Sequence, residues 1–85
     1  MTLLRSWNEE ATMHDVDIDN RLKLARTERG LTQTDLADRA GVTRQTIGLI
    51  EAGRYNPTLK LCLILARETG KTLDELFWIK GDEPC

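Results

Sequence analysis

The stretch Gln33–Gly53, QTDLADRAGVTRQTIGLIEAG, constrains the fold most, because it indicates two short helices joined by a sharp turn. Ala37 is small enough to let the two helices approach closely. Gly41 can take a positive φ without steric cost, as a tight turn between helices requires. Thr43 stands where an N-cap belongs, so its hydroxyl can accept a hydrogen bond from the helix that starts at Arg44. The pattern predicts a helix pair held at a defined angle.

The second helix of this pair is expected to have one apolar face. Ile47 and Ile50 lie three residues apart, so both can pack against Leu36 and Ala40 of the preceding helix. The opposite face carries Arg44, Gln45 and, in part, Thr46 and Leu49. A polar helix start that a turn holds outward has the shape needed to enter the major groove of DNA.

Start and stop signals predict three further helices around this pair. The bounding residues are Asp19 or Asn20 and Gly30 for the first helix, Thr58 and Gly70 for the fourth (59–69), and Thr72 for a short fifth. Thr32 with Asp35, and Thr72 with Glu75, also have the spacing of a capping box. No segment alternates with period two over a useful length, so we predict an all-α domain of five helices.

The net charge of −2 hides an uneven distribution of charge along the chain. Residues 1–19 carry a net charge of −4, residues 20–61 of +4, and residues 62–85 of −2. The positive charge therefore coincides with the helix pair, as expected of a surface that meets nucleic-acid phosphates.

The length of 85 residues suits one domain. We divide the chain into an acidic, loosely ordered N-terminal arm (1–18), a helical domain (19–80) and a C-terminal tail (81–85).

The chain has no apolar run long enough to span a membrane. Cys62 and Cys85 lack the spacing of a metal site, so we expect no metal or cofactor, and a reducing, cytoplasmic compartment. No catalytic arrangement of side chains stands out, so we do not expect an enzyme.

Taken together, these residues resemble a known family. The run RLKLARTERGLTQTDLADRAGVTRQTIGLIEAGRYNPTLKLCLILARETGKTLDELF is similar to the phage-repressor or Cro-type helix-turn-helix domain, also called XRE-like. The similarity covers about residues 20–79. It implies a five-helix, lambda-repressor-like domain that binds specific sites in double-stranded DNA, usually as a homodimer. The family regulates transcription in prokaryotes and phages.

The resemblance also assigns roles to polar residues. It implies that the third helix enters the major groove with four residues at its start: Thr43, Arg44, Gln45 and Thr46. Gln33 would contact phosphate or brace the first base-reading side chain. Arg44 can pair with guanine and Gln45 with adenine, each worth about 1–3 kcal/mol of base discrimination. The DNA backbone would be held by Arg54, Asn56 and Lys60. Glu51 is expected to pair with an arginine of the first helix and not to bind DNA.

Some apolar side chains near the C-terminus have no obvious place in the core. They could form a patch through which a second copy binds: Leu61, Ile64, Leu65, Trp78 and Ile79. Trp78 could instead fold back over its own domain. Two other functions stay open, namely an antitoxin-like DNA-binding protein whose arm or C-terminal patch binds a toxin, and a protein-interaction module that does not bind DNA.

Overall fold

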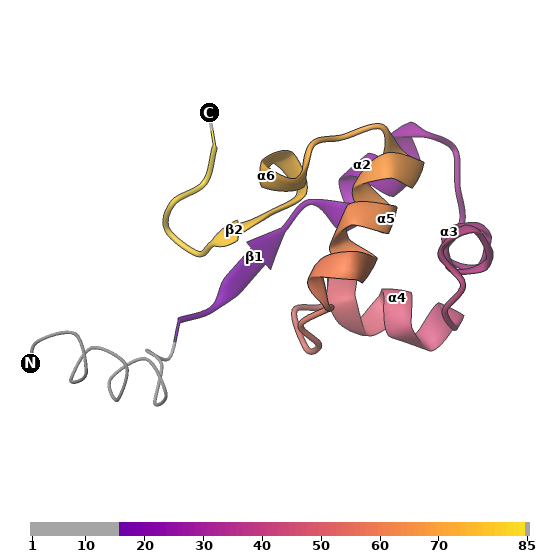
Figure 1. Cartoon of the computed structure of the whole chain (residues 1–85), viewed down its shortest axis with the longest axis horizontal. Helices are drawn as coiled ribbons and strands as arrows, with labels where there is room; N and C mark the ends of the chain where they lie inside the picture. The colour runs from indigo at the N-terminus through magenta and orange to yellow at the C-terminus, as the bar shows by residue number, and fades with distance from the viewer. Residues whose placement is uncertain (1–15, 85) are drawn as a thin grey trace, which may run out of the picture.

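The computed structural model describes residues 16–84 and confirms the five predicted helices. In chain order the elements are β1 (Ile18–Asn20), α2 (Leu22–Glu28), α3 (Gln33–Ala40), α4 (Arg44–Glu51), α5 (Leu59–Thr69), α6 (Leu73–Leu76) and β2 (Phe77–Ile79). Figure 1 shows the two strands side by side at one end of the molecule and α3 and α4 toward the other. None of the described helices is long and apolar enough to cross a membrane.

Capping boxes start two of the helices, as the spacing predicted. The Thr32 hydroxyl accepts from the backbone N–H of Asp35 at 3.0 Å, and the Thr32 N–H donates to Asp35 Oδ2 at 2.9 Å. The Thr72 N–H donates to Glu75 Oε1 at 2.8 Å. These hydrogen bonds from backbone N–H groups favour the ionised carboxylates, so the pKa of Asp35 and the pKa of Glu75 lie below their usual values.

Asn20 lies two residues before the first residue of α2 and hydrogen-bonds to the backbone N–H of that residue. Its Oδ1 accepts from the Leu22 N–H at 3.0 Å, while its Nδ2 donates to the Ile50 carbonyl at 3.0 Å. One side chain therefore joins the start of α2 to the end of α4. Because Asn20 bridges two elements, it positions the helix pair as well as the first helix.

The core lies where all the helices meet, and six aliphatic side chains in it are almost completely shielded from solvent. These are Leu22, Leu36, Ile47, Ile50, Leu65 and Leu76. Leu61 is also buried, at 9% exposure. The prediction that Leu61 and Leu65 form a subunit contact is therefore wrong, because both side chains point from α5 into their own domain.

A short antiparallel strand pair is added to the five predicted helices of the all-α fold. Ile18 pairs with Ile79 and Asn20 with Phe77, so β1 and β2 join the two ends of the described chain. The Lys80 N–H adds a bond to the Asp17 carbonyl at 2.8 Å. Strands of three residues are too short to show an alternation in sequence. The pairing also places Ile18 in the folded domain, while most of the predicted arm (1–18) lies outside the described residues.

Trp78 folds back over its own domain, which was the second of the two predicted alternatives. Its ring lies under the Arg21 guanidinium, 5.0 Å from ring centroid to guanidinium carbon, and Arg21 also pairs with Glu83 at 2.6 Å. Trp78 is half-buried, whereas Ile79 beside it remains 47% exposed. The tryptophan therefore contributes to the packing of the strand pair.

Candidate nucleic-acid interface

The turn between α3 and α4 has the geometry that its glycine predicts. Gly41 adopts a left-handed conformation with φ 76°, and its N–H donates to the Ala37 carbonyl. Thr43 then caps α4, because its hydroxyl accepts from the Thr46 N–H at 3.1 Å. The Thr43 and Thr46 hydroxyls also share a hydrogen bond of 3.0 Å. The two threonines thus organise the first turn of α4.

The start of α4 is open to solvent in the described chain. Thr43, Arg44 and Gln45 are exposed, and Thr46 is half-buried. On the opposite face Ile47 and Ile50 are buried in the core, so the helix is anchored along one side only. Leu49 is 36% exposed. Among residues 16–84 the Arg44 and Gln45 side chains remain exposed at this tip, so both can reach a partner.

A buried ion pair supports this tip from inside the domain. Arg26 of α2 donates from Nε to Glu51 Oε2 at 2.7 Å and from Nη2 to Glu51 Oε1 at 3.3 Å. The two side chains are only 9% and 6% exposed. Arg26 also donates from Nη1 to the Leu31 carbonyl at 2.9 Å. The expected pairing of Glu51 with an arginine of the first helix is confirmed, and it ties α2 to the end of α4.

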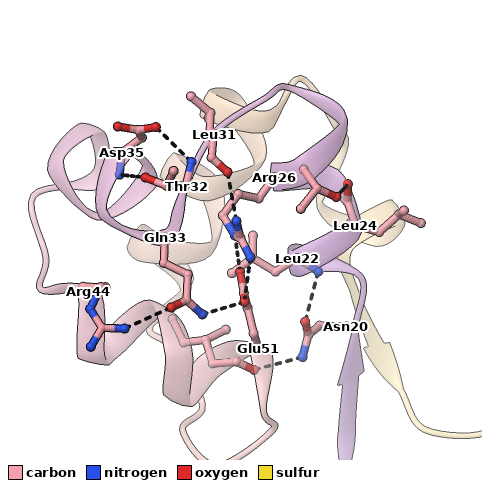
Figure 2. Close-up of polar contacts among 12 residues, drawn as sticks. Asn20, Leu22, Leu24, Arg26, Leu31, Thr32, Gln33, Asp35, Arg44 and Glu51 are labelled. Carbon is pink, nitrogen blue, oxygen red and sulfur yellow. Dashed lines mark hydrogen bonds and ion pairs between the residues drawn. The ribbon is translucent and has the colours of Figure 1, made fainter.

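Gln33 connects this ion pair to the exposed tip. Its Nε2 donates to Glu51 Oε1 at 3.0 Å, and its Oε1 accepts from Arg44 Nη1 at 3.2 Å. Figure 2 shows the resulting row of side chains, from Arg26 through Glu51 and Gln33 to Arg44. Of the two roles predicted for Gln33, the contact that braces Arg44 is present in the structure.

The remaining predicted residues flank the helix pair. Arg54 and Asn56 are exposed in the loop after α4, and Lys60 is exposed in the first turn of α5. Asn56 lies on the side of β1, where it lines a polar groove together with Asp17 and Lys80. Asn56 is therefore also near groups that belong to the strand pair.

Lys23 and Thr27 also border the candidate interface, although no sequence motif singled them out. Both line an open groove together with Gln33 and Arg44. Their four-residue spacing on α2 was the available signal, since residues four apart share one helix face. Only the tertiary arrangement reveals that this face borders α3.

Relatives of the chain are found among transcriptional regulators. The helix-turn-helix family model HTH_3 matches residues 22–76. An HTH-type transcriptional regulator of Methanocaldococcus jannaschii is 45% identical over 64 residues, which are 75% of this chain and 97% of that protein. The immunity repressor protein of Bacillus phage phi105 is 40% identical over 53 residues, which are 62% of this chain and 37% of the repressor.

A solved structure has the same fold. The restriction-modification controller protein C.AhdI from Aeromonas hydrophila matches with a TM-score of 0.60 at 35% identity, over 64% of this chain and 82% of the controller. The fold and the exposed polar tip of α4 define a helix-turn-helix DNA-binding domain. The chain belongs to the HTH_3, or XRE-type, family of transcriptional regulators.

Proposed function

We propose that this protein regulates transcription by binding specific sites in duplex DNA, as a cytoplasmic homodimer with the start of α4 in the major groove. The exposed Arg44–Gln45 tip carries the proposal, because it presents hydrogen-bonding side chains from a helix anchored by Ile47 and Ile50. Such a rigid support is what base recognition requires.

Base selection falls to Arg44 and Gln45. The Arg44 guanidinium can donate two hydrogen bonds to O6 and N7 of guanine, and the Gln45 amide can pair with N6 and N7 of adenine. The Thr46 methyl group is available to a thymine methyl. Thr43 stays mainly a cap, since its hydroxyl is already bonded within α4.

Phosphate contacts position the domain without reading sequence. The exposed cations Arg54 and Lys60 flank α4 on one side, and Lys23 borders the groove beside Gln33 on the other. Asn56 completes the set on the loop side. We expect binding to weaken steeply with salt, because each neutralised phosphate releases a counterion.

Exposed apolar side chains near the strand pair support the homodimer. Leu59 is 66% exposed and Ile79 47%, and both line one apolar groove with Trp78. Half-buried Ile64 remains available on α5. A second copy that covers this surface would remove apolar area from water. The dimer would read a pseudo-palindromic site with half-site centres about 34–36 Å apart.

Selection of bound duplexes from a random pool tests the proposal. We expect one inverted-repeat motif, and we expect Arg44→Ala to lose the preference for guanine at one position of each half-site. Arg67→Ala is the matched control, because it removes an equal charge from an exposed position on α5. A pool that shows no enrichment, or an Arg44→Ala protein that selects the wild-type motif, would refute the proposal.

A further inference from the structure

Gln33 lies between one group that can only donate hydrogen bonds and one that can only accept them. Arg44 offers N–H groups alone, and the ionised Glu51 offers oxygens alone. The Gln33 amide has one end of each kind. Only one orientation satisfies both neighbours: the nitrogen toward Glu51 at 3.0 Å and the oxygen toward Arg44 at 3.2 Å.

We propose that Glu51 is a positioning residue for base recognition, which sets the orientation of the Gln33 amide and thereby directs the Arg44 guanidinium. The inference rests on the proposed function, because it concerns how Arg44 selects its base. The Glu51 side chain is only 6% exposed, so we expect no direct contact between it and DNA. Its effect reaches the base through the Gln33 amide.

Glu51 is well suited to this role because its own carboxylate is held rigidly. Both of its oxygens accept from Arg26, and its side chain is 6% exposed. Arg26 is in turn anchored to the Leu31 carbonyl. The row of side chains in Figure 2 therefore begins in the packed interior and ends at the exposed tip.

The brace matters because Arg44 is otherwise a long, exposed side chain with many rotamers. A guanidinium pairs with guanine only when two of its N–H groups lie in the plane of the base. The bond to Gln33 Oε1 restricts the guanidinium before DNA arrives, so less conformational entropy is lost on binding. An amide turned the other way would present N–H groups to Arg44 and push it aside.

A direct phosphate contact is the competing role for Gln33, and the two roles predict different losses. Loss of a phosphate contact weakens binding to all sequences alike. It also makes the binding constant less dependent on salt concentration. Loss of a brace lowers the preference at the one base pair that Arg44 reads. The position of that base pair is defined by the Arg44→Ala variant.

The test compares Gln33→Met and Glu51→Gln singly and together. Methionine keeps the length of the side chain but removes both amide atoms. Glutamine at position 51 can donate or accept, so it no longer imposes one orientation on Gln33. Binding is measured by competition among four duplexes that differ only at the Arg44 base pair. Glu68→Gln, which makes the same change on α5, is the control.

We expect each single variant to lower the preference for guanine at this position about tenfold, the effect of losing one well-placed hydrogen bond. In the double variant, Glu51→Gln should add no further loss, because its effect passes through the missing amide. A purely structural role for Glu51 would leave the preference unchanged and reduce stability alone. An unaltered preference in Gln33→Met and Glu51→Gln would overturn the inference.

A measurement on the wild-type protein covers the case in which Glu51→Gln fails to fold. A Cβ at Gly48 would lie 3.7 Å from Gln33 Nε2, so a Gly48 α-proton points toward that nitrogen. We expect nuclear Overhauser contacts between the Gln33 side-chain amide protons and the Gly48 α-protons. Their absence would overturn the inferred orientation. Wild-type protein that selects no duplex would instead defeat the proposed function.

Discussion

Removal of the Glu51 carboxylate should strongly destabilise the domain, because this group is one half of a buried ion pair. Glu51→Ala leaves Arg26 with a buried, uncompensated charge, because the Arg26 side chain is 9% exposed and loses both bonds to Glu51. Only the bond to the Leu31 carbonyl remains. Breaking a buried ion pair by removing one partner costs about 3–5 kcal/mol.

This loss is large relative to the stability of a small domain. At about 0.05–0.15 kcal/mol per residue, a folded region of this length has a free energy of unfolding of roughly 3–10 kcal/mol. Glu51→Ala therefore removes roughly a third or more of the free energy of unfolding. Urea denaturation followed by circular dichroism measures the change. The slope m, which is the dependence of the free energy of unfolding on urea concentration, should be the same for the variant and the wild type.

Two further variants make the measurement decisive. Glu83→Ala removes a solvent-exposed partner of Arg21, whose side chain is 35% exposed, so it should cost less than about 1 kcal/mol. Arg26→Met combined with Glu51→Leu removes both charges and should recover most of the stability, apart from about 1 kcal/mol for the unpaired Leu31 carbonyl. If Glu51→Ala and Glu83→Ala unfold at the same urea concentration, the reasoning about the buried pair is wrong.

Three other outcomes can be checked by the same denaturation assay. Gly48→Ala should stabilise the domain by about 1 kcal/mol, because alanine has a higher helix propensity than glycine. The added Cβ would lie 3.7 Å from Gln33 Nε2, which is an ordinary van der Waals contact. A lower unfolding midpoint would contradict this prediction. Leu65→Ala should lower the free energy of unfolding by about 2–5 kcal/mol. Leu63 is 51% exposed, so Leu63→Ala should lower it by less than about 1 kcal/mol. Equal losses in the two variants would contradict the burial of Leu65. The folded pKa of Asp35 is lowered, so its stabilisation is complete above its usual pKa of 3.8 and is lost as the pH falls through the folded value. Asp35→Asn should therefore reduce the dependence of stability on pH below about 4, and an unchanged profile between wild type and variant would argue against the capping-box contribution.

The helices could be predicted because their signals are local. Thr32 and Thr72 cap helices whose first turns lie within three residues of them, and Gly41 permits a turn through its own φ. The apolar spacing of Ile47 and Ile50 is equally local. Such features depend on short-range sterics and hydrogen bonds, which the order of residues specifies without knowledge of distant segments.

The pairing of β1 with β2 could not be predicted in this way. Ile18 and Ile79 come together from opposite ends of the described chain, and three-residue strands have no periodic signature. Leu61 and Leu65 illustrate the same difficulty on α5. Their apolar character was evident, but only the packing of neighbouring helices decides which apolar positions of a helix face inward.

The sequence by itself determined the five helices, the turn at Gly41 and the identity of the residues at the start of α4. The tertiary structure alone decided that Arg26, Glu51, Gln33 and Arg44 form one connected row. The physical reason is distance along the chain: these groups come from three helices, and hydrogen bonds between them exist only after the core has set the helices at their final positions.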